Sequence, residues 1–243
     1  MYIRSIELLG GEFAGEDAYL ASIPAIRGLD RLDLSARPVT FFVGENGSGK
    51  STLLEAVAVA AGFNPEGGSL NLRFATANTH SGLHSRLRLV REPRRPRDGY
   101  FLRAESFYNV ASAIDELDED HTLIDSYGGR SLHRQSHGES FLSLVLNRLG
   151  GAGLYIFDEP EAALSPSRQL ALLCAMHRLV QARSQLLIAT HSPILMAYPG
   201  AALYLLDEQG IAPVAYEDTE HYQVTRSFLQ DPVRMLEVLF AQG

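Results

Sequence analysis

The order of apolar and polar positions predicts short strands at the start of the chain, followed by a helix. Residues 2–9, YIRSIELL, and the stretch that leads to residues 39–43, VTFFV, have the pattern of strands. The uninterrupted apolar run 39–43 is typical of a strand that is buried on both faces of a sheet. Residues 51–63 then combine helix-forming residues, and Gly62 ends the predicted helix.

The middle of the chain is less regular. Within residues 63–104, turns separate three strand-like pieces, LNLRFAT, LHSRLRLV and GYFLRA. Residues from about 105 to 135 are mixed and polar, and we expect them to be partly helical. The segment ESFLSLVLNRL, residues 139–149, predicts a largely apolar helix that is closed by Gly150 and Gly151.

The second half of the chain alternates between strand and helix patterns. The predicted elements are a strand at 153–157, a helix at 165–183, a strand at 185–190, a helix at 192–198 and a strand at 201–207. Such alternation is typical of a parallel sheet with covering helices. Residues 231–240, DPVRMLEVLF, predict a closing helix. Because we see no linker that would require two independent domains, residues 1–243 are predicted to form one domain.

The composition is that of a globular protein, with 46% apolar residues. No apolar run reaches the about 18 residues that a membrane span requires, and the first residues lack the apolar stretch of a signal peptide. The single cysteine, Cys174, lies in an apolar helical run and excludes a disulfide framework. We therefore expect a cytoplasmic protein with no membrane insertion.

The net charge of −8 argues against a general binder of nucleic acid or anionic membranes. The charge is uneven, however, because arginines gather between Arg86 and Arg97 around the segment REPRRPRDG. A solvated hairpin is the ordinary interpretation of this segment, and a patch that contacts phosphates of nucleic acid is the alternative. Lys50 is the only lysine in the chain.

The segment GENGSGKST, residues 44–52, has the chemistry of a phosphate-binding loop. Residues 44–51 fit the pattern G-x-x-x-x-G-K-[ST], and they connect a predicted buried strand to a predicted helix. Backbone N–H groups and the helix N-terminus would attract phosphate. Lys50 would bridge the β- and γ-phosphates, and Ser51 would bind Mg²⁺. The predicted nucleotide-binding residues of this loop are Gly44, Glu45, Asn46, Gly47, Ser48, Gly49, Lys50, Ser51 and Thr52.

The base of the nucleotide follows from the lysine count. A guanine-binding Asn-Lys-x-Asp motif needs a lysine outside the loop, and the chain has none. ATP is therefore the favoured nucleotide.

Two further strands end in residues suited to phosphate chemistry. The segment GLYIFDEPE ends in Asp158 and Glu159, and the strand LLIAT is followed by His191. Because ligands bind at the carboxyl ends of parallel strands, we expect Asp158 to hold the Mg²⁺ hydration shell and Glu159 to act as general base. His191 would reach the γ-phosphate. A solvated acidic turn and a structural histidine are the alternatives.

The segment SHGES, residues 136–140, opens the predicted apolar helix. Ser136 and Glu139 have the spacing of a capping box. A capped helix N-terminus with a nearby glycine is also an anion site, and both interpretations can hold together.

Together these segments resemble the ATP-binding-cassette (ABC) ATPase superfamily over about residues 38–195. GENGSGKST resembles its Walker A motif, and LYIFDEPE resembles its Walker B motif with the adjoining glutamate. SHGES stands at the place of the signature motif, with Ser136, Gly138 and Glu139 on the matching positions. EPEAALS resembles the D-loop, and His191 matches the switch histidine. The resemblance is strongest to soluble, stand-alone ATPases such as the heads of RecF, SMC and OLD-type proteins.

The chain departs from this pattern at several positions. His137 replaces a signature glycine, and Ser165 replaces the D-loop aspartate. No glutamine occurs between the phosphate loop and Gln135, so the Q-loop glutamine is missing; Glu105 or Ser106 is the candidate replacement by position. Tyr19 is the candidate for stacking on adenine.

The resemblance implies an α/β P-loop NTPase of ABC type. Its sheet would be mainly parallel with flanking helices, an N-terminal antiparallel subsheet, and a small helical lobe at about residues 105–148. Two chains would enclose two Mg·ATP, with Ser136, Gly138 and Glu139 of one chain over the γ-phosphate bound by the other. Lys50, Glu159 and His191 would be the catalytic residues of this ATPase.

The role of such an ATPase is left open by the sequence. The main hypothesis is a conformational switch that acts on an unknown protein partner. A DNA-linked ATPase in repair or phage defence is an alternative, which only the arginine hairpin supports. A nucleotide-binding subunit of an ABC transporter is another, and the intact Asp158–Glu159 pair argues against a module that binds ATP without hydrolysing it.

Overall fold

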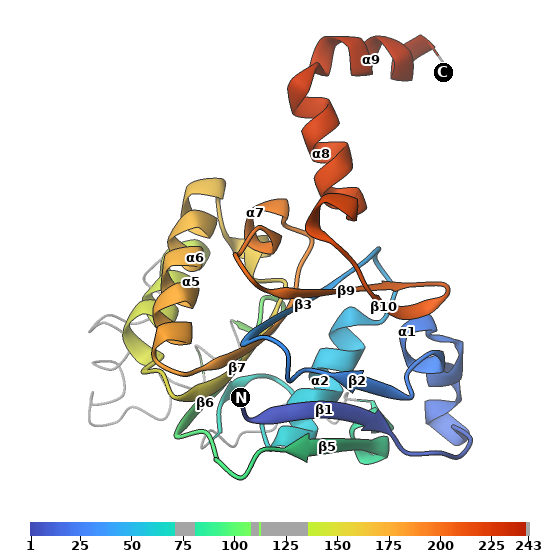
Figure 1. Ribbon diagram of the computed structural model, residues 1–243, viewed down its shortest axis with the longest axis vertical. Coiled ribbons are helices and arrows are strands. Elements are labelled where there is room, and N and C mark those ends of the chain that lie inside the picture. Colours follow the sequence, from blue (N-terminus) through green and yellow to red (C-terminus); the bar gives the residue numbers. More distant parts are fainter. Residues whose placement is uncertain (71–80, 108–111, 113–135, 242–243) are drawn as a thin grey trace.

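A computed structural model describes residues 1–70, 81–107, 112 and 136–241 (Figure 1). Its centre is a seven-stranded sheet. The strand order is β10 (Gly210–Pro213), β9 (Ala202–Asp207), β3 (Val39–Val43), β8 (Gln185–Ala189), β7 (Gly153–Asp158), β6 (Asp98–Arg103) and β4 (Gly68–Ser69). The strands from β9 to β6 run parallel, and the two edge strands are antiparallel to their neighbours. The predicted, mainly parallel sheet is confirmed.

The central strands are buried on both faces, as their apolar runs predict. Every residue of β3, β7 and β8 is buried. Successive side chains of a strand point to opposite faces, so Phe41 joins one apolar core and Phe42 joins the other. Helices α5 (His137–Ser143) and α6 (Pro166–Gln181) cover the Phe41 face, whereas α2 (Lys50–Ala61) covers the Phe42 face.

A second, three-stranded antiparallel sheet packs on the outer side of α2. Its order is β2 (Arg31–Asp33), β1 (Ile3–Leu8) and β5 (Leu87–Arg91). Ile3 and Ile6 of β1 belong to the same core as the residues of α2. The side-chain amide of Gln185 ties the two sheets together, because its oxygen accepts hydrogen bonds from the backbone of Tyr2 at 2.7 Å and Ile3 at 2.9 Å. This sheet is the expected N-terminal antiparallel subsheet.

The remaining described elements are short connections. They are the single-turn helices α1 (Pro24–Arg27) and α7 (Pro193–Met196), and 3₁₀ segments at Gly15–Ser22, Gly82–Arg86, Pro160–Ala163 and Tyr216–Asp218. The helix expected at 139–149 begins at His137 and continues beyond α5 as a π-helical segment, Leu144–Arg148. Most of the expected lobe at 105–148, and most of the expected strand LNLRFAT, lie outside the described residues.

The chain ends in a helical arm that projects away from the body (Figure 1). The arm consists of α8 (Glu220–Gln230) and α9 (Pro232–Ala241). The helix expected at 231–240 is thus present, but it does not close on the body; Leu229 is 72% exposed and Phe240 is 76% exposed. Helix α8 and strand β10 are absent from the sequence-based expectation.

Within the described ranges, no helix combines the length and the apolar character needed to cross a membrane.

Candidate active site

The loop between β3 and α2 is shaped by glycines. Gly44 and Gly49 have φ angles of 146° and 99°, which L-residues rarely adopt. A Cβ atom at Gly44 would overlap the carbonyl oxygen of Leu206, and one at Gly49 would overlap the side chain of Ile23. The loop therefore turns against the end of β9 and opens α2 with its N–H groups, the arrangement that binds phosphate.

Lys50 occupies the centre of this loop. Its ammonium donates hydrogen bonds to the carbonyl oxygens of Gly44 at 2.9 Å and Glu45 at 2.8 Å. The side chain is buried, and this burial lowers the pKa of Lys50 from its ordinary value. Nearby carboxylates, Glu159 first among them, oppose this effect without removing it. An added phosphate would stabilise the buried ammonium further, because it would form a charge-assisted bond to it.

The residues expected at the Mg²⁺ site meet at the carboxyl end of β7. The hydroxyl of Ser51 donates to Oδ1 of Asp158 at 2.9 Å, and Nε of Arg103 lies 3.7 Å from Oδ2. Burial raises the pKa of Asp158 to about 6, although Ser51 and Arg103 both act to lower it. A cation bound to this carboxylate would stabilise its ionised form and so offset the cost of its burial.

The donor set fits Mg²⁺. A hydroxyl and a carboxylate are oxygen ligands, which Mg²⁺ prefers, and it usually takes one or two such groups together with phosphates and water. Among the residues that the structure describes, no group of three or more His, Cys, Asp or Glu could hold a metal by itself. The site is thus suited to a metal that arrives with a phosphate ligand.

Glu159 follows Asp158 in a left-handed conformation, with φ 50° and ψ 53°. A non-glycine residue in this region is strained, and such strain gathers at functional sites. Its backbone N–H donates to the carbonyl oxygen of Ala189 at 3.0 Å, which fixes the turn to β8. The side chain is 39% exposed, so a water molecule can reach its carboxylate.

His191 lies beside Glu159 at the end of β8. Its Nε2 atom is 3.5 Å from Oε1 of Glu159, and its Nδ1 atom is 2.9 Å from Nε2 of His221. Burial and the charge of Lys50 lower the pKa of His191. The structure therefore brings together the carboxylate and imidazole expected from two separate strands.

A groove of about 480 Å³ runs along the outer side of the phosphate loop. It is lined by Pro24, residues 44–48, residues 205–208 and residues 218–221. Ser136, Gly138 and Glu139 are not among these lining residues. Tyr19, the candidate for adenine stacking, is 52% exposed and does not line the groove either.

The expected signature residues lie at the start of α5. Ser136 precedes the helix, and its backbone N–H donates to Oε2 of Glu139 at 3.0 Å in a capping box. Arg168 of α6 pairs with Oε1 of Glu139 at 3.1 Å. A Cβ atom at Gly138 would lie 2.6 Å from the carbonyl oxygen of Ala163, so only glycine allows this approach. The start of α5 is thus anchored to the segment that follows Glu159.

Comparison with known families decides the identity of this fold. Residues 39–99 and 131–197 match the family described as "AAA domain, putative AbiEii toxin, Type IV TA system". The chain belongs to this AAA domain family. It is a P-loop ATPase domain of ABC type, as the motifs predict.

Curated relatives and solved structures agree with this assignment. The ABC transporter ATP-binding/permease protein Rv1747 of Mycobacterium tuberculosis is 27% identical over 187 residues, which are 68% of this chain and 21% of that protein. The galactose/methyl galactoside import ATP-binding protein MglA of Salmonella typhimurium is 26% identical over 192 residues, 70% of this chain and 37% of that protein. The chain thus spans well under half the length of these relatives.

The ABC fold extends over the whole described domain. The structure of cbiO1 from Clostridium perfringens, part of the ABC transporter complex cbiONQ, matches with a TM-score of 0.52 at 14% sequence identity. The match covers 98% of this chain and 99% of that one. At this identity the likeness shows the fold alone.

Neither candidate for the missing Q-loop glutamine contacts the predicted Mg²⁺ site among the contacts of the described residues. Glu105 has an exposed side chain, and the hydroxyl of Ser106 donates to the carbonyl oxygen of Glu66. Arg103, at the end of β6, is the residue that approaches Asp158, and its guanidinium also donates to Glu55 at 2.7 Å. Sequence reasoning missed Arg103 because only the pairing of β6 with β7 brings it to this edge.

Glu161 and His221 are further residues of the site that the sequence analysis missed. The carboxylate of Glu161 accepts a hydrogen bond from the backbone N–H of His191 at 2.5 Å, and its burial raises its pKa. Glu161 is the second glutamate of the segment DEPE, residues 158–161, and its closeness in the chain to Asp158 and Glu159 could have indicated that it belongs to the site. His221 lies in the first turn of α8, 30 residues after His191, and it belongs to no recognisable sequence motif.

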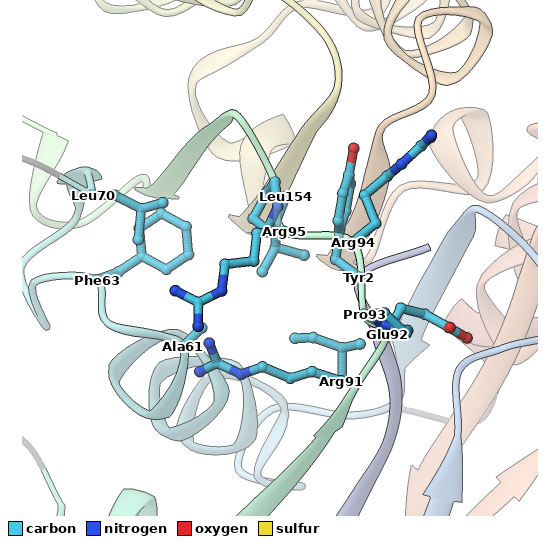
Figure 2. A pocket seen from close by; sticks show the side chains of 12 residues that line it. Tyr2, Ala61, Phe63, Leu70, Arg91, Glu92, Pro93, Arg94, Arg95 and Leu154 are labelled. Carbon is cyan, nitrogen blue, oxygen red and sulfur yellow. The ribbon is translucent and has the colours of Figure 1, made fainter.

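The predicted hairpin between Arg86 and Arg97 is wrong, because β5 pairs with β1 in the three-stranded sheet and β6 pairs with β7 in the seven-stranded sheet. The first three arginines of this segment bind neighbouring parts of the protein, and Arg91 donates to the carbonyl oxygen of Ala60 at 2.9 Å. Arg86 donates to the carbonyl oxygens of Leu9 and Gly10, and Arg88 pairs with Glu7. A pocket of about 480 Å³ is lined by Arg91, Arg94 and Arg95 together with apolar residues. Figure 2 shows these side chains. The basic surface is therefore smaller than the hairpin from Arg86 to Arg97 suggested.

Proposed function

We propose that this chain hydrolyses ATP with Mg²⁺ and that two chains form the complete site. The observation that carries the proposal is the convergence of Lys50, the Ser51–Asp158 pair and the Glu159–His191 pair at one edge of the sheet. A cation, a metal-ligand pair and a base are the parts that phosphoryl transfer to water needs. The matched family and the ABC fold support the same chemistry.

In this mechanism the residues of one chain hold and activate the reactants. Lys50 exchanges its loop carbonyls for the β- and γ-phosphates. Ser51 and Asp158 would hold Mg²⁺, which would supply positive charge to the phosphate oxygens. Water attacks the γ-phosphorus as the bond to the β–γ bridging oxygen breaks, and Glu159 takes the proton from that water. A general base of this kind contributes about 10²–10⁴-fold to the rate. His191 donates a hydrogen bond to the γ-phosphate.

The second chain would supply the signature residues. Ser136, Gly138 and Glu139 do not line the groove beside the phosphate loop of their own chain, so another chain's site is the place where they would act. The helical arm supports this pairing. It begins at the rim of the groove, at Glu220 and His221, and exposes a row of large apolar side chains that a second chain could cover.

A mixing experiment tests the shared site. Phosphate release is measured for the wild type, for Lys50→Ala, for Ser136→Arg and for an equimolar mixture of the two variants. Each variant alone should be inactive, whereas the mixture should regain activity, because one site of a mixed dimer combines an intact Lys50 with an intact Ser136. A wild type without ATP-dependent phosphate release would refute the ATPase itself.

The partner of this ATPase is a separate question. The curated relatives are named as ATP-binding parts of transporters, which favours a transporter subunit over a switch for an unidentified protein. We therefore propose the nucleotide-binding subunit of an ABC transporter as the leading role. In the native organism, a tagged chain should fractionate with membranes and copurify a permease. If the tagged chain is recovered only in the soluble fraction, the conformational switch becomes the favoured role.

A role on DNA is the second candidate, and the pocket of Figure 2 favours it. Among the described residues, no ion pair neutralises Arg94 or Arg95, while the nearby Glu92 pairs with Arg4 at 3.3 Å. Unneutralised arginines beside this pocket suit the phosphates of a nucleic-acid backbone. DNA should then stimulate the ATPase, and Arg94→Glu with Arg95→Glu should abolish the stimulation without changing basal turnover.

A further inference from the structure

We propose that His221 is a positioning residue for His191. It donates a hydrogen bond from its Nε2–H to Nδ1 of His191, and so holds His191 in the tautomer whose Nε2–H faces Glu159 and the γ-phosphate. This inference rests on the proposed ATPase function, and it names a residue outside every motif of the sequence.

The first step is the contact between the two rings. Nδ1 of His191 and Nε2 of His221 are 2.9 Å apart, with ring centroids separated by 5.1 Å and an interplanar angle of 55°. A neutral imidazole has one N–H and one bare nitrogen. Two neutral rings can therefore share this hydrogen bond in one direction only, and that direction fixes the tautomer of His191.

The second step is the direction of the bond. Nε2 of His191 is buried, has no closer partner, and lies 3.5 Å from the carboxylate of Glu159. A bare Nε2 lone pair would face this carboxylate with an unfavourable interaction, whereas an Nε2–H would face it favourably. His191 therefore carries its proton on Nε2, its Nδ1 accepts, and His221 is the donor.

The surroundings keep both rings neutral. Burial lowers the pKa of His191 and of His221, and the ammonium of Lys50 acts in the same direction on both. Three carboxylates oppose this: Glu159 acts on His191, and Glu45 and Glu220 act on His221, but burial is the largest influence in each case.

The third step is the anchoring of the two rings. The backbone N–H of His191 is held by Glu161, so the end of β8 is fixed beside Glu159. His221 lies in the first turn of α8, where Thr219 caps the helix by accepting from the N–H of Tyr222 at 3.4 Å. The donor and the acceptor thus belong to two separately fixed elements, and this is the geometry that orients a ring.

The consequence concerns turnover more than ATP binding. In the other tautomer, a bare Nε2 would face the γ-phosphate oxygens as well as Glu159, and the expected hydrogen bond would be lost as charge develops there. Removal of the carbonyl or carboxylate that orients a metal-bound histidine lowers activity by about 10–100-fold, and we expect a loss of at least about tenfold here.

Two measurements test the proposal. Nitrogen-15 NMR of the full-length, nucleotide-free chain should show Nε2 of His191 protonated and Nδ1 bare, and His221→Phe should yield a mixture of tautomers. In steady-state kinetics, His221→Phe should lower kcat and leave KM for ATP nearly unchanged. His221→Gln places an amide donor at the same position and should restore much of the lost kcat.

His177→Phe is the matched control. This imidazole also contacts a side chain, with Nδ1 at 3.2 Å from the hydroxyl of Tyr198, but it lies on α6 outside the site. The control should leave kcat and the His191 tautomer unchanged.

Three outcomes are decisive. A wild-type His191 protonated on Nδ1 would overturn the proposal, and so would full kcat in His221→Phe. A wild type without ATP hydrolysis would refute the proposed function, while the nitrogen-15 spectrum would still decide the tautomer.

Discussion

Asp158→Asn should stabilise the nucleotide-free protein while it removes ATPase activity. Asp158 is 6% exposed, and its burial raises its pKa from 3.8 to about 6. Each pKa unit corresponds to about 1.4 kcal/mol, so the ionised carboxylate destabilises the folded state by about 3 kcal/mol once the pH is above about 6.5. Asparagine keeps the shape of the side chain and an acceptor for Ser51, and it removes this cost.

The sign follows from proton binding. A carboxyl group with a raised pKa binds its proton more tightly in the folded state, so the cost of ionisation is present at neutral pH and vanishes below the ordinary value of 3.8. The advantage of Asp158→Asn should therefore be about 3 kcal/mol at about pH 7.5 and about half of that at about pH 5. For a chain of this size, 3 kcal/mol corresponds to about 6–12 °C in Tm.

Calorimetric melting at both pH values, without nucleotide, measures this difference. Asp98→Asn is the control, because Asp98 accepts from Tyr155 at 2.8 Å and pairs with Arg148 at 3.1 Å, so its substitution should lower the Tm. Mg·ATP should raise the Tm of the wild type more than that of Asp158→Asn. The reasoning is wrong if Asp158→Asn melts below the wild type at about pH 7.5, or if the difference does not change with pH.

Three further predictions concern the phosphate loop, the signature and the arm. Lys50→Ala should lower ATP affinity by at least about tenfold in a fluorescent-nucleotide titration, because it removes a charge-assisted bond to phosphate; unchanged affinity would contradict the role of the loop. Gly138→Ala should lower phosphate release with little change in ATP binding to the single chain, because its Cβ would meet the carbonyl oxygen of Ala163 at 2.6 Å; full turnover would contradict the packing. Leu229→Ser should weaken ATP-dependent dimers in sedimentation, whereas Leu9→Ser, at another exposed leucine, should not; equal effects would exclude the arm from the interface.

Local patterns were sufficient to predict the elements whose burial is complete. The run 39–43 and the strands that end at Asp158 and Ala189 are largely apolar on both faces, and their short length and flanking turn residues favour buried strands over buried helices. The phosphate loop could also be predicted, because its glycines and Lys50 are consecutive in the chain.

The remaining features depend on contacts between distant segments. Arg103 reaches Asp158 only through the pairing of β6 with β7, and His221 reaches His191 only through the path of the chain after β10. Residues 231–240 were predicted to form a closing helix, but the large apolar residues of α8 and α9, such as Leu229 and Phe240, remain exposed. An amphipathic pattern predicts that a face is to be covered, and it does not say by which chain.

The mass of Glu159→Gln in the presence of saturating Mg·ATP tests the central claim most directly. This variant keeps the binding residues and lacks the base, so ATP should stay bound. Sedimentation should show a particle of twice the 26.7 kDa chain mass with Mg·ATP and a single chain without it. Adding Ser136→Arg should return the variant to a single chain. A monomer at saturating Mg·ATP, or a dimer that forms equally well with Ser136→Arg, would contradict a site shared between two chains.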